Sequence, residues 1–227
     1  MKKVTFALMS LAMIVSIALS SCSKDDDETP LTISQTTLTM AHGDTLSITA
    51  NQKSTFTSAD PFVATVTDDG KIEAKHVGQT VVTATAGEQS KECTVTVKPV
   101  YNLYQEPILD FELTKNDIMA QETRPLEEDR DTVLVYSDKK TYLMYYSFDA
   151  QTSKLKSATY GMPNISYAQS SVLTDFLIER YQPIDMKENN CYFINSADPS
   201  TASMIVSMEL SVNRLQIDAV MVYLKKK

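Results

Sequence analysis

The sequence contains few of the residues on which most enzyme active sites depend. Its 227 residues include only two histidines, His42 and His76, which lie beside expected turns and are predicted at the surface rather than as ligands. Residues 100–227 contain no histidine, so Cys191 lacks the imidazole that activates most cysteine nucleophiles, and one cysteine cannot build a zinc site. Gly161 is the only glycine in this stretch, which excludes a glycine-rich phosphate loop. The sequence therefore predicts a non-enzymatic protein without metal or cofactor.

Basic residues are also scarce. The formal net charge is −8, and residues 22–227 carry 19 basic and 29 acidic residues, a net charge of −10. This balance opposes binding to nucleic acid, which needs a basic surface. Pairs of carboxylates could hydrolyse glycosides, and the nearest clusters are Asp110 with Glu112 and the run Glu127–Asp129. We interpret these as solvated loop carboxylates.

The first 21 residues have the pattern of an export signal. Lys2 and Lys3 precede the uncharged run Val4–Leu19, whose 16 residues are short for a membrane span of about 20. The quartet Leu19-Ser-Ser-Cys22 resembles the lipobox of bacterial lipoproteins, in which cleavage before the cysteine is coupled to lipid attachment on its thiol. The resemblance implies a membrane anchor on Cys22. The alternative is an ordinary secretory signal with an incidental cysteine.

Residues 22–30 form an acidic linker. The run Asp25–Glu28 resembles the surface-export signal of lipoproteins in the Bacteroides group, which implies an outer-membrane protein that faces the cell exterior. The alternative is a flexible, solvated tether that does not direct export to the surface. Cys22 carries the lipid in this hypothesis, so only Cys93 and Cys191 remain, and we expect no disulfide between them because they lie in separate predicted domains.

A change of composition near residue 100 predicts two domains, 31–99 and 100–227. All 11 tyrosines lie between Tyr101 and Tyr223, whereas four of the five glycines precede them. The first segment is rich in threonine and valine, and it alternates in short runs typical of a small antiparallel sandwich. Asp68-Asp69-Gly70 is expected to form a hairpin turn, and Cys93 to be a buried, unreactive side chain. The predicted strands are 31–34, 44–50, 64–67, 71–74, 80–86 and 91–97.

The same segment resembles a known family along nearly its whole length. The residues that carry the resemblance are Ser58–Val66, Asp69–Ala74, Val77–Thr80 and Cys93–Val97. They are similar to the bacterial immunoglobulin-like group 2 domain, with one departure at Phe56, where many members carry tryptophan. The resemblance implies a rigid spacer or adhesion module on a cell surface. The alternative to a binding role is a spacer with no ligand of its own.

The second segment is predicted to be an α+β domain in which one helix and three strands occur twice. Capping-box spacing at Thr114/Asp117 and Ser166/Gln169 predicts helices over 114–122 and 167–181. We expect a charged loop at 124–131, a break at 162–166, and both helices on one face of an antiparallel sheet. This order resembles the β-lactamase-inhibitor-protein-like fold, and its combination with the preceding domain resembles a lipoprotein layout of gut Bacteroides. The predicted strands are 132–137, 141–148, 154–160, 190–195, 201–210 and 215–224.

Tyrosine supplies the candidate binding surface, because its ring is rigid, amphipathic and suited to protein partners or sugars. The candidates are Tyr101, Tyr104, Tyr136, Tyr145 and Tyr160. The competing interpretation is that most of these rings pack against the sheet. We expect a lipid-anchored envelope protein that presents a protein- or glycan-binding domain on an Ig-like stalk. The alternative is a periplasmic-facing lipoprotein that inhibits or scaffolds an envelope enzyme.

Overall fold

The computed structural model describes residues 29–138, 142–187, 189–213 and 216–225. The unit Leu31–Lys227 contains every described helix and strand. The predicted signal peptide 1–21 and lipidation site Cys22 lie outside the described residues. Within those residues, no helix combines the length and the apolar character needed to cross a membrane.

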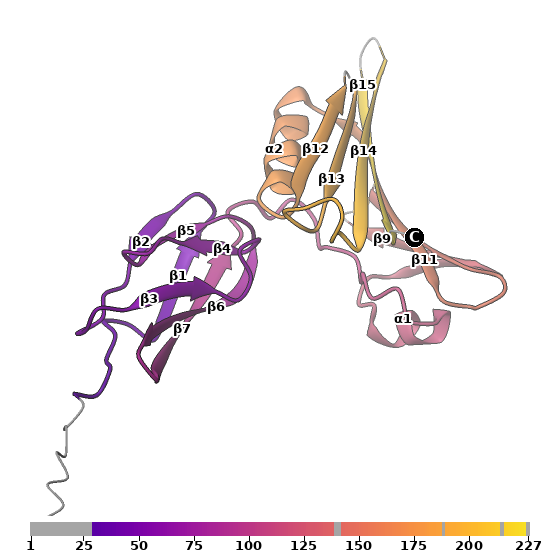
Figure 1. Ribbon diagram of the computed structural model, residues 1–227. Helices are drawn as coiled ribbons and strands as arrows, with labels where there is room; N and C mark the ends of the chain where they lie inside the picture. The colour runs from indigo at the N-terminus through magenta and orange to yellow at the C-terminus, as the bar shows by residue number, and fades with distance from the viewer. Residues whose placement is uncertain (1–28, 139–141, 188, 214–215, 226–227) are drawn as a thin grey trace, which may run out of the picture. The chain divides into compact units, whose positions relative to one another are not determined.

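Residues 31–98, hereafter the sandwich, form two β-sheets around one core (Figure 1). The four-stranded sheet has the order β1 (Thr37–Ala41), β7 (Gln89–Lys98), β6 (Gly78–Ala86) and β3 (Thr55–Ser58). The three-stranded sheet has the order β2 (Thr45–Ser47), β5 (Lys71–Ala74) and β4 (Ala64–Val66). Only β1 and β7 pair in parallel. Alternate residues of both sheets point inward, and among them Cys93 is fully buried in the core, as predicted.

The strands of the sandwich that the sequence did not predict are β1 and β3, the two edges of the larger sheet. The predicted strand 31–34 makes only an isolated bridge, between Ile33 and Ala50. Both missed strands are short, and each alternates between exposed threonine and a buried apolar residue, as a half-buried strand does. The alternation of β1 and β3 was therefore present in the sequence and was overlooked.

The turn at Gly70 is confirmed and requires glycine. Gly70 has φ +81° between β4 and β5, and a Cβ atom there would lie 2.2 Å from the carbonyl oxygen of Ile48. The same hypothetical Cβ would lie 3.2 Å from the ring of Phe56. The missing side chain thus leaves room for Phe56, which packs in the core where the family resemblance leads one to expect tryptophan.

The prediction that both histidines lie at the surface is wrong for His76. Its side chain is buried, stacks on Phe62 with ring centroids 4.0 Å apart, and its Nδ1 lies 2.7 Å from the carbonyl oxygen of Phe62. Burial lowers the pKa of the His76 imidazole. His42 is the less buried of the two and lies near the Lys75 carbonyl.

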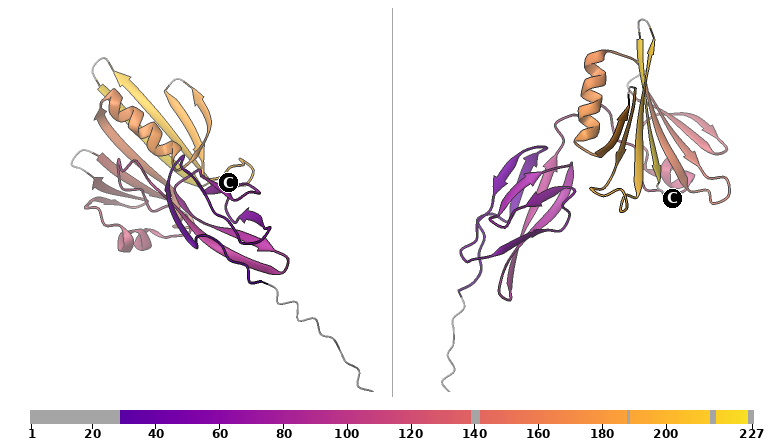
Figure 2. Two further views of the ribbon diagram at one scale, coloured as in Figure 1. Left: turned by 90° about the vertical axis from the view of Figure 1, so that its left-hand side faces the viewer. Right: turned by 45° about the horizontal axis from the view of Figure 1, so that its top comes forward.

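The described residues of 100–225, hereafter the C-terminal half, form two helices and one eight-stranded antiparallel sheet (Figure 2). The sheet order is β12-β13-β14-β15-β11-β10-β9-β8, so two four-stranded meanders meet through their last strands, β11 and β15. The first unit consists of α1 (Lys115–Gln121), β8 (Leu126–Arg130), β9 (Val133–Asp138), β10 (Tyr142–Phe148) and β11 (Leu155–Ile165). The second consists of α2 (Tyr167–Ile178), β12 (Gln182–Lys187), β13 (Asn190–Ile194), β14 (Met204–Asn213) and β15 (Gln216–Lys225).

The predicted repeat is correct in order but wrong in strand number, because each helix is followed by four strands instead of three. The missed strands, β8 and β12, are the two edges of the sheet. The charged sequence of β8 was predicted to be a loop, and β12, which contains Pro183, was not predicted at all. Charges and proline are typical of edge strands, where they discourage pairing with other chains. The predicted break at 162–166 is also wrong, since β11 continues to Ile165 with a register shift after Met162.

Both predicted capping boxes are present. The Thr114 hydroxyl accepts the N–H of Asp117 while the Asp117 carboxylate accepts the N–H of Thr114. The Ser166 and Gln169 side chains make the same exchange at the start of α2. Reciprocal capping satisfies backbone donors at each N-terminus and fixes where the helix begins.

One hydrophobic core joins both helices to the sheet. Ile118 of α1 and Leu173, Phe176 and Leu177 of α2 are fully buried in it. The residues that they meet occupy alternate positions along β9, β10, β11, β13, β14 and β15, and the pairing register places these positions on one face. The two helices therefore cover the same face of the sheet, and no helix of the described residues lies on the opposite face.

A buried Glu–Arg pair follows each helix. Glu122 caps the C-terminus of α1 and pairs with Arg124; their side chains are 1% and 3% exposed. Glu179 caps α2 and pairs with Arg180; these side chains are 0% and 6% exposed. Both guanidinium groups donate to carbonyls of the segment before α1: Arg124 to Glu106 at 3.1 Å and Arg180 to Tyr101 at 3.1 Å. The two units thus use equivalent ion pairs to hold the same leading segment, residues 100–108.

Candidate binding face

The face of the eight-stranded sheet opposite the helices is the candidate binding surface. In antiparallel strands, side chains alternate between faces, and residues paired across strands share a face. The pairings Tyr145–Thr159, Thr159–Val222, Val222–Ser207 and Ser207–Tyr192 therefore form one continuous row across five strands. We name this surface the open face; its members are Leu143, Tyr145, Thr159, Gly161, Tyr192, Ile205, Ser207, Glu209, Val220, Val222 and Leu224.

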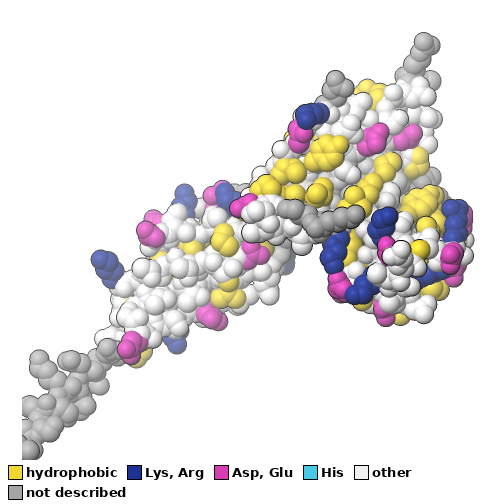
Figure 3. All heavy atoms as spheres, turned by 45° about the vertical axis from the view of Figure 1, so that its right-hand side comes forward, with side chains coloured by type: hydrophobic (Ala, Val, Ile, Leu, Met, Phe, Trp, Pro, Cys, Tyr) yellow, Lys and Arg dark blue, Asp and Glu magenta, His cyan; other side chains and the backbone are white. Residues whose placement is uncertain are grey.

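Apolar side chains dominate the open face. Tyr192 and Val220 are each 38% exposed and Leu224 is 39% exposed, although all three belong to regular strands. Tyr145, Val222 and Ile205 are half-buried by their neighbours on the same face. Glu209 is the only charged residue among these eleven, but the pairing register places further polar and charged residues on the same face, including Asp185, Ser211 and Asp218. Figure 3 shows hydrophobic side chains gathered across the C-terminal half on the side turned away from α2.

Gly161 flattens the centre of this surface. It pairs with Leu143 on one side and Val220 on the other, and it contributes no side chain between them. The nearest atom to a Cβ built there is the carbonyl oxygen of Leu143, at 4.0 Å. A small side chain would fit, so the glycine is not required by backbone strain. What it provides is a shallow gap between apolar neighbours.

Of the five predicted tyrosines, three cannot form a binding surface. Tyr104, Tyr136 and Tyr160 are 5%, 3% and 0% exposed and belong to the core beneath the helices. Tyr101 is half-buried, and the carboxylate of Asp175, on α2, is the main cause of its raised pKa, so it lies on the helical side. Tyr145 alone lies on the open face, and its role in binding stays a prediction.

The buried tyrosines are tolerated because their hydroxyl groups find partners. Tyr160 donates to Asp138 at 2.6 Å, Tyr146 donates to Glu122 at 2.6 Å, and Tyr104 is hydrogen-bonded to Tyr223. Burial is the largest cause of the raised pKa of each of these phenols. Most of the predicted tyrosines therefore pack in the core with their hydroxyl groups hydrogen-bonded, in agreement with the competing interpretation that these rings pack against the sheet.

Tyr192 is the aromatic member of the open face that the sequence interpretation missed. It lies between Cys191 and Phe193, both of which point into the core. The alternation of this strand was visible in the sequence, but which parity faces the core depends on its pairing with β14. Cys191 is buried in that core, and burial raises the pKa of its thiol.

The carboxylate clusters considered for catalysis serve local structure. Glu112 pairs with Lys154 and Lys225, Glu128 with Arg130, and Asp129 with Lys115. Asp110 accepts the N–H of Glu112 at 2.9 Å. Among the described residues, no group of three His, Cys, Asp or Glu side chains is close enough to hold a metal ion.

Comparison with protein families identifies the first part of the chain. Residues 27–97 match the bacterial Ig-like domain (group 2). The match includes all seven strands of the sandwich except the final residue of β7, and it agrees with the resemblance carried by Ser58–Val66 and Asp69–Ala74. The sandwich is therefore called the Ig-like domain below.

Solved structures add little to this assignment. Domains 5–6 of the S-layer protein SbsC are 15% identical, with a TM-score of 0.27, over 87% of this chain and 84% of that one. Domains 4–9 of the same surface-layer protein are 14% identical, with a TM-score of 0.28, over 88% of this chain and 27% of that one. TM-scores this low carry no argument about fold or function. No curated protein matches the sequence.

Proposed function

We propose that this chain is a non-enzymatic protein of the bacterial cell envelope, anchored by lipid on Cys22, whose open face binds a protein partner. The Ig-like domain acts as a spacer between the anchor and the C-terminal half. The observation that carries the proposal is the asymmetry of the eight-stranded sheet: one face is buried beneath two helices, and the other has an apolar centre at which Tyr192, Val220 and Leu224 are exposed, while Val135 and Ile194 near its margins are buried. Exposed apolar patches of this kind mark interaction sites in soluble domains.

The size of the open face suits the centre of a protein interface. Each position on one face of a sheet covers about 4.8 Å across strands and roughly 6.7 Å along them, so eleven positions cover roughly 350 Å². A standard interface buries about 800 Å² on each partner, with an apolar centre and a polar rim. Glu209 and the edge strands β8 and β12, which contain Arg130 and Lys187, supply such a rim.

The aliphatic centre favours a protein over a glycan. Sugars stack on aromatic planes, and the two tyrosines of the central row lie four strand spacings apart, roughly 19 Å. Thr159, Val222 and Ser207 separate them. The complementary surface on a partner is therefore expected to be uncharged and largely aliphatic.

The proposed lipid anchor and cellular location depend on the N-terminal sequence. Intact-mass analysis of the native protein is expected to show a chain that begins at Cys22 and carries acyl groups. Protease treatment of intact cells is expected to remove the C-terminal half; protection until the outer membrane is broken would place the protein in the periplasm instead. That outcome would favour the alternative role as an inhibitor or scaffold of an envelope enzyme.

A photo-crosslinking residue at position 222 tests the open face on intact cells. Val222 lies in the middle of the central row, and the crosslinked partner is then purified and its affinity for the full chain measured. Val222→Glu is expected to weaken binding about thirtyfold or more, because it buries an unpaired charge at the interface centre. Ser171→Glu adds the same charge to the exposed side of α2 and is expected to leave affinity unchanged.

Other occupants of the face give different results. If the chain binds a glycan and Val222→Glu abolishes this binding, the ligand of the open face is a sugar and not a protein. A concentration-dependent dimer, detected by light scattering and lost in the same variant, would make the occupant a second copy. Equal effects of Val222→Glu and Ser171→Glu would exclude the open face altogether.

A further inference from the structure

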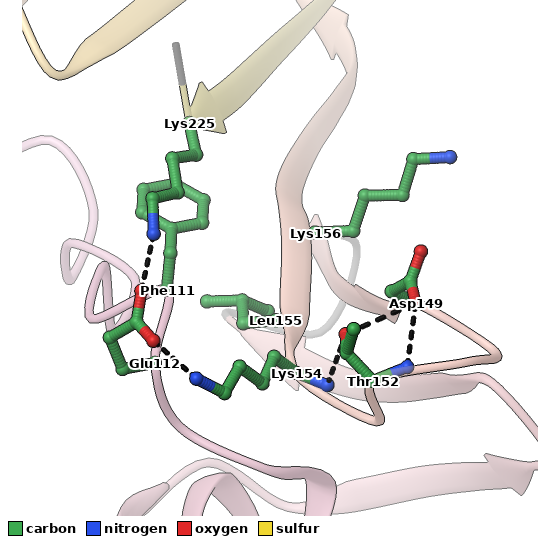
Figure 4. A pocket seen from close by; sticks show the side chains of 8 residues that line it. All are labelled: Phe111, Glu112, Asp149, Thr152, Lys154, Leu155, Lys156 and Lys225. Atoms are coloured by element: carbon green, nitrogen blue, oxygen red, sulfur yellow. Dashed lines mark hydrogen bonds and ion pairs between the residues drawn. The ribbon is translucent and has the colours of Figure 1, made fainter. Parts of the chain in front are cut away.

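A pocket of about 510 Å³ lies at one end of the C-terminal half, apart from the open face. The loop before α1, the β10–β11 hairpin and the end of β15 supply its lining (Figure 4). The volume lies within the range of small-molecule sites, about 300–1,000 Å³. Phe111 and Leu155, which belong to the hydrophobic core or pack at its margin, provide an apolar base. The pocket shares no residue with the open face.

Two lysines of this pocket already hold a carboxylate between them. Lys154, just before β11, and Lys225, the last residue of β15, pair with the two oxygens of Glu112, as Figure 4 shows. Their ammonium groups lower the pKa of Glu112 to about 2. The second acid of the pocket, Asp149, is engaged by the hairpin turn, where it accepts the N–H groups of Gln151 at 3.0 Å and Thr152 at 2.8 Å.

Lys156 supplies the unpaired charge. Ser147 pairs with Ser157 whereas Phe148 pairs with Leu155, so Lys156 is the extra residue of a β-bulge. Bulges redirect side chains that regular alternation would place on a sheet face, and this one places Lys156 in the pocket lining. Lys156 makes no hydrogen bond or close ion pair with any residue that the structure describes, and its charge contributes to the lowered pKa of the neighbouring Asp149. With three lysines and two carboxylates, the pocket has one surplus positive charge in a chain of net charge −8.

We propose that this pocket binds a small organic carboxylate, with Lys156 as the charge partner of the ligand; its side chain extends away from Glu112, to which Lys154 and Lys225 point (Figure 4). The aliphatic stems of the lysines, together with Phe111 and Leu155, contact the body of the ligand. Glu112, Asp149 and the negative charge of the chain repel polyanions, so a single carboxylate fits the surplus of one charge. The carboxylate can belong to an acidic sugar or to an aliphatic acid.

Titration of the full chain, followed by NMR of its backbone amides, tests the proposal. Sodium glucuronate and sodium hexanoate represent the two sources, and glucose and hexanamide are their neutral counterparts. At least one carboxylate is expected to give saturable shifts at residues 149–156, with affinity at least tenfold above that of its neutral counterpart. Glucuronate alone would identify an acidic sugar and hexanoate alone an aliphatic acid; the absence of saturation with either overturns the proposal.

Two substitutions predict changes of opposite sign. Lys156→Gln is expected to weaken carboxylate binding about tenfold, the effect of one charge-assisted hydrogen bond. Glu112→Gln is expected to strengthen it several-fold, because Lys154 and Lys225 are released and a negative charge is removed. Lys187→Gln, a lysine on β12 paired with Asp185, is the control and is expected to change nothing. Unchanged binding in Lys156→Gln, or weaker binding in Glu112→Gln, overturns the assignment.

Discussion

Replacement of Arg180 by methionine tests how the C-terminal half is held together. The Arg180 side chain is 6% exposed and donates to four acceptors: the carboxylates of Glu106 and Glu179 and the carbonyl oxygens of Phe176 and Tyr101. Its guanidinium carbon also lies 3.6 Å from the centroid of the Phe176 ring. Arg180→Met keeps much of the volume and removes all of these interactions at once.

The main cost arises at the partner that remains. The Glu179 side chain is 0% exposed, and without Arg180 its carboxylate retains the N–H groups of Val100 at 2.9 Å and Tyr101 at 3.1 Å but no positive charge. Loss of one member of a buried ion pair costs about 3–5 kcal/mol. This is a large part of the roughly 5–15 kcal/mol that stabilises a typical domain. The double variant Glu179→Gln, Arg180→Met removes the stranded charge and is expected to recover about half of the loss.

Tyrosine provides a local probe for this experiment. All 11 tyrosines lie between Tyr101 and Tyr223 and the chain has no tryptophan, so near-ultraviolet circular dichroism reports unfolding of the C-terminal half without the Ig-like domain. Urea unfolding followed at this signal gives the free energy of unfolding for each variant. A loss below about 1 kcal/mol in Arg180→Met, or a double variant no more stable than the single one, would refute the argument.

Further predictions concern the Ig-like domain and the pocket. Gly70→Ala is expected to cost roughly 3 kcal/mol, and Gly87→Ala, also at positive φ but with no atom within 4 Å of its Cβ, about 1 kcal/mol; calorimetry that gives equal losses would contradict this. Burial lowers the pKa of His76, so its neutral form stabilises the fold. This contribution to stability is complete above pH 6.5 and decreases as the pH falls below that value. His76→Gln is expected to remove this dependence of the melting temperature on pH. The pKa of Glu112 is lowered to about 2, so its ion pairs are complete above its ordinary pKa of 4.5 and are lost as the pH falls through about 2. An NMR titration midpoint near 4.5 for Glu112 in the native chain would contradict the pairing. Lys225→Gln is expected to raise this midpoint.

Local signals in the sequence identified the features that short segments determine. Both capping boxes involve residues three positions apart, and the Gly70 turn involves a single backbone conformation, so no distant partner was needed to predict them. The edge strands β8 and β12 escaped prediction for the opposite reason. β1, β3, β8 and β12 each pair on one side only, and in β8 and β12 the charges and the proline that protect such edges resemble loop sequences.

The candidate face could be predicted only in part. Period-two alternation separates Tyr142, Met144 and Tyr146, on one side of β10, from Tyr145 on the other. It could not show which side the helices cover, because that depends on how the two units combine. For the same reason the buried Tyr104, Tyr136 and Tyr160 were taken as surface candidates and Tyr192 was overlooked. The pocket at Lys156 depends on a bulge in the pairing of two strands, which local alternation does not reveal.

The position of β15 has a consequence for how the C-terminal half is completed. This strand is the last of the described elements, yet it lies between β14 and β11 in the middle of the sheet. Until residues 216–225 have been synthesised, each meander has an unpaired inner edge, and the apolar positions that Met221 and Tyr223 occupy are empty. Folding of this half must therefore await synthesis of β15. A chain that lacks residues 216–225 would form two separate half-sheets instead of one slightly smaller sheet.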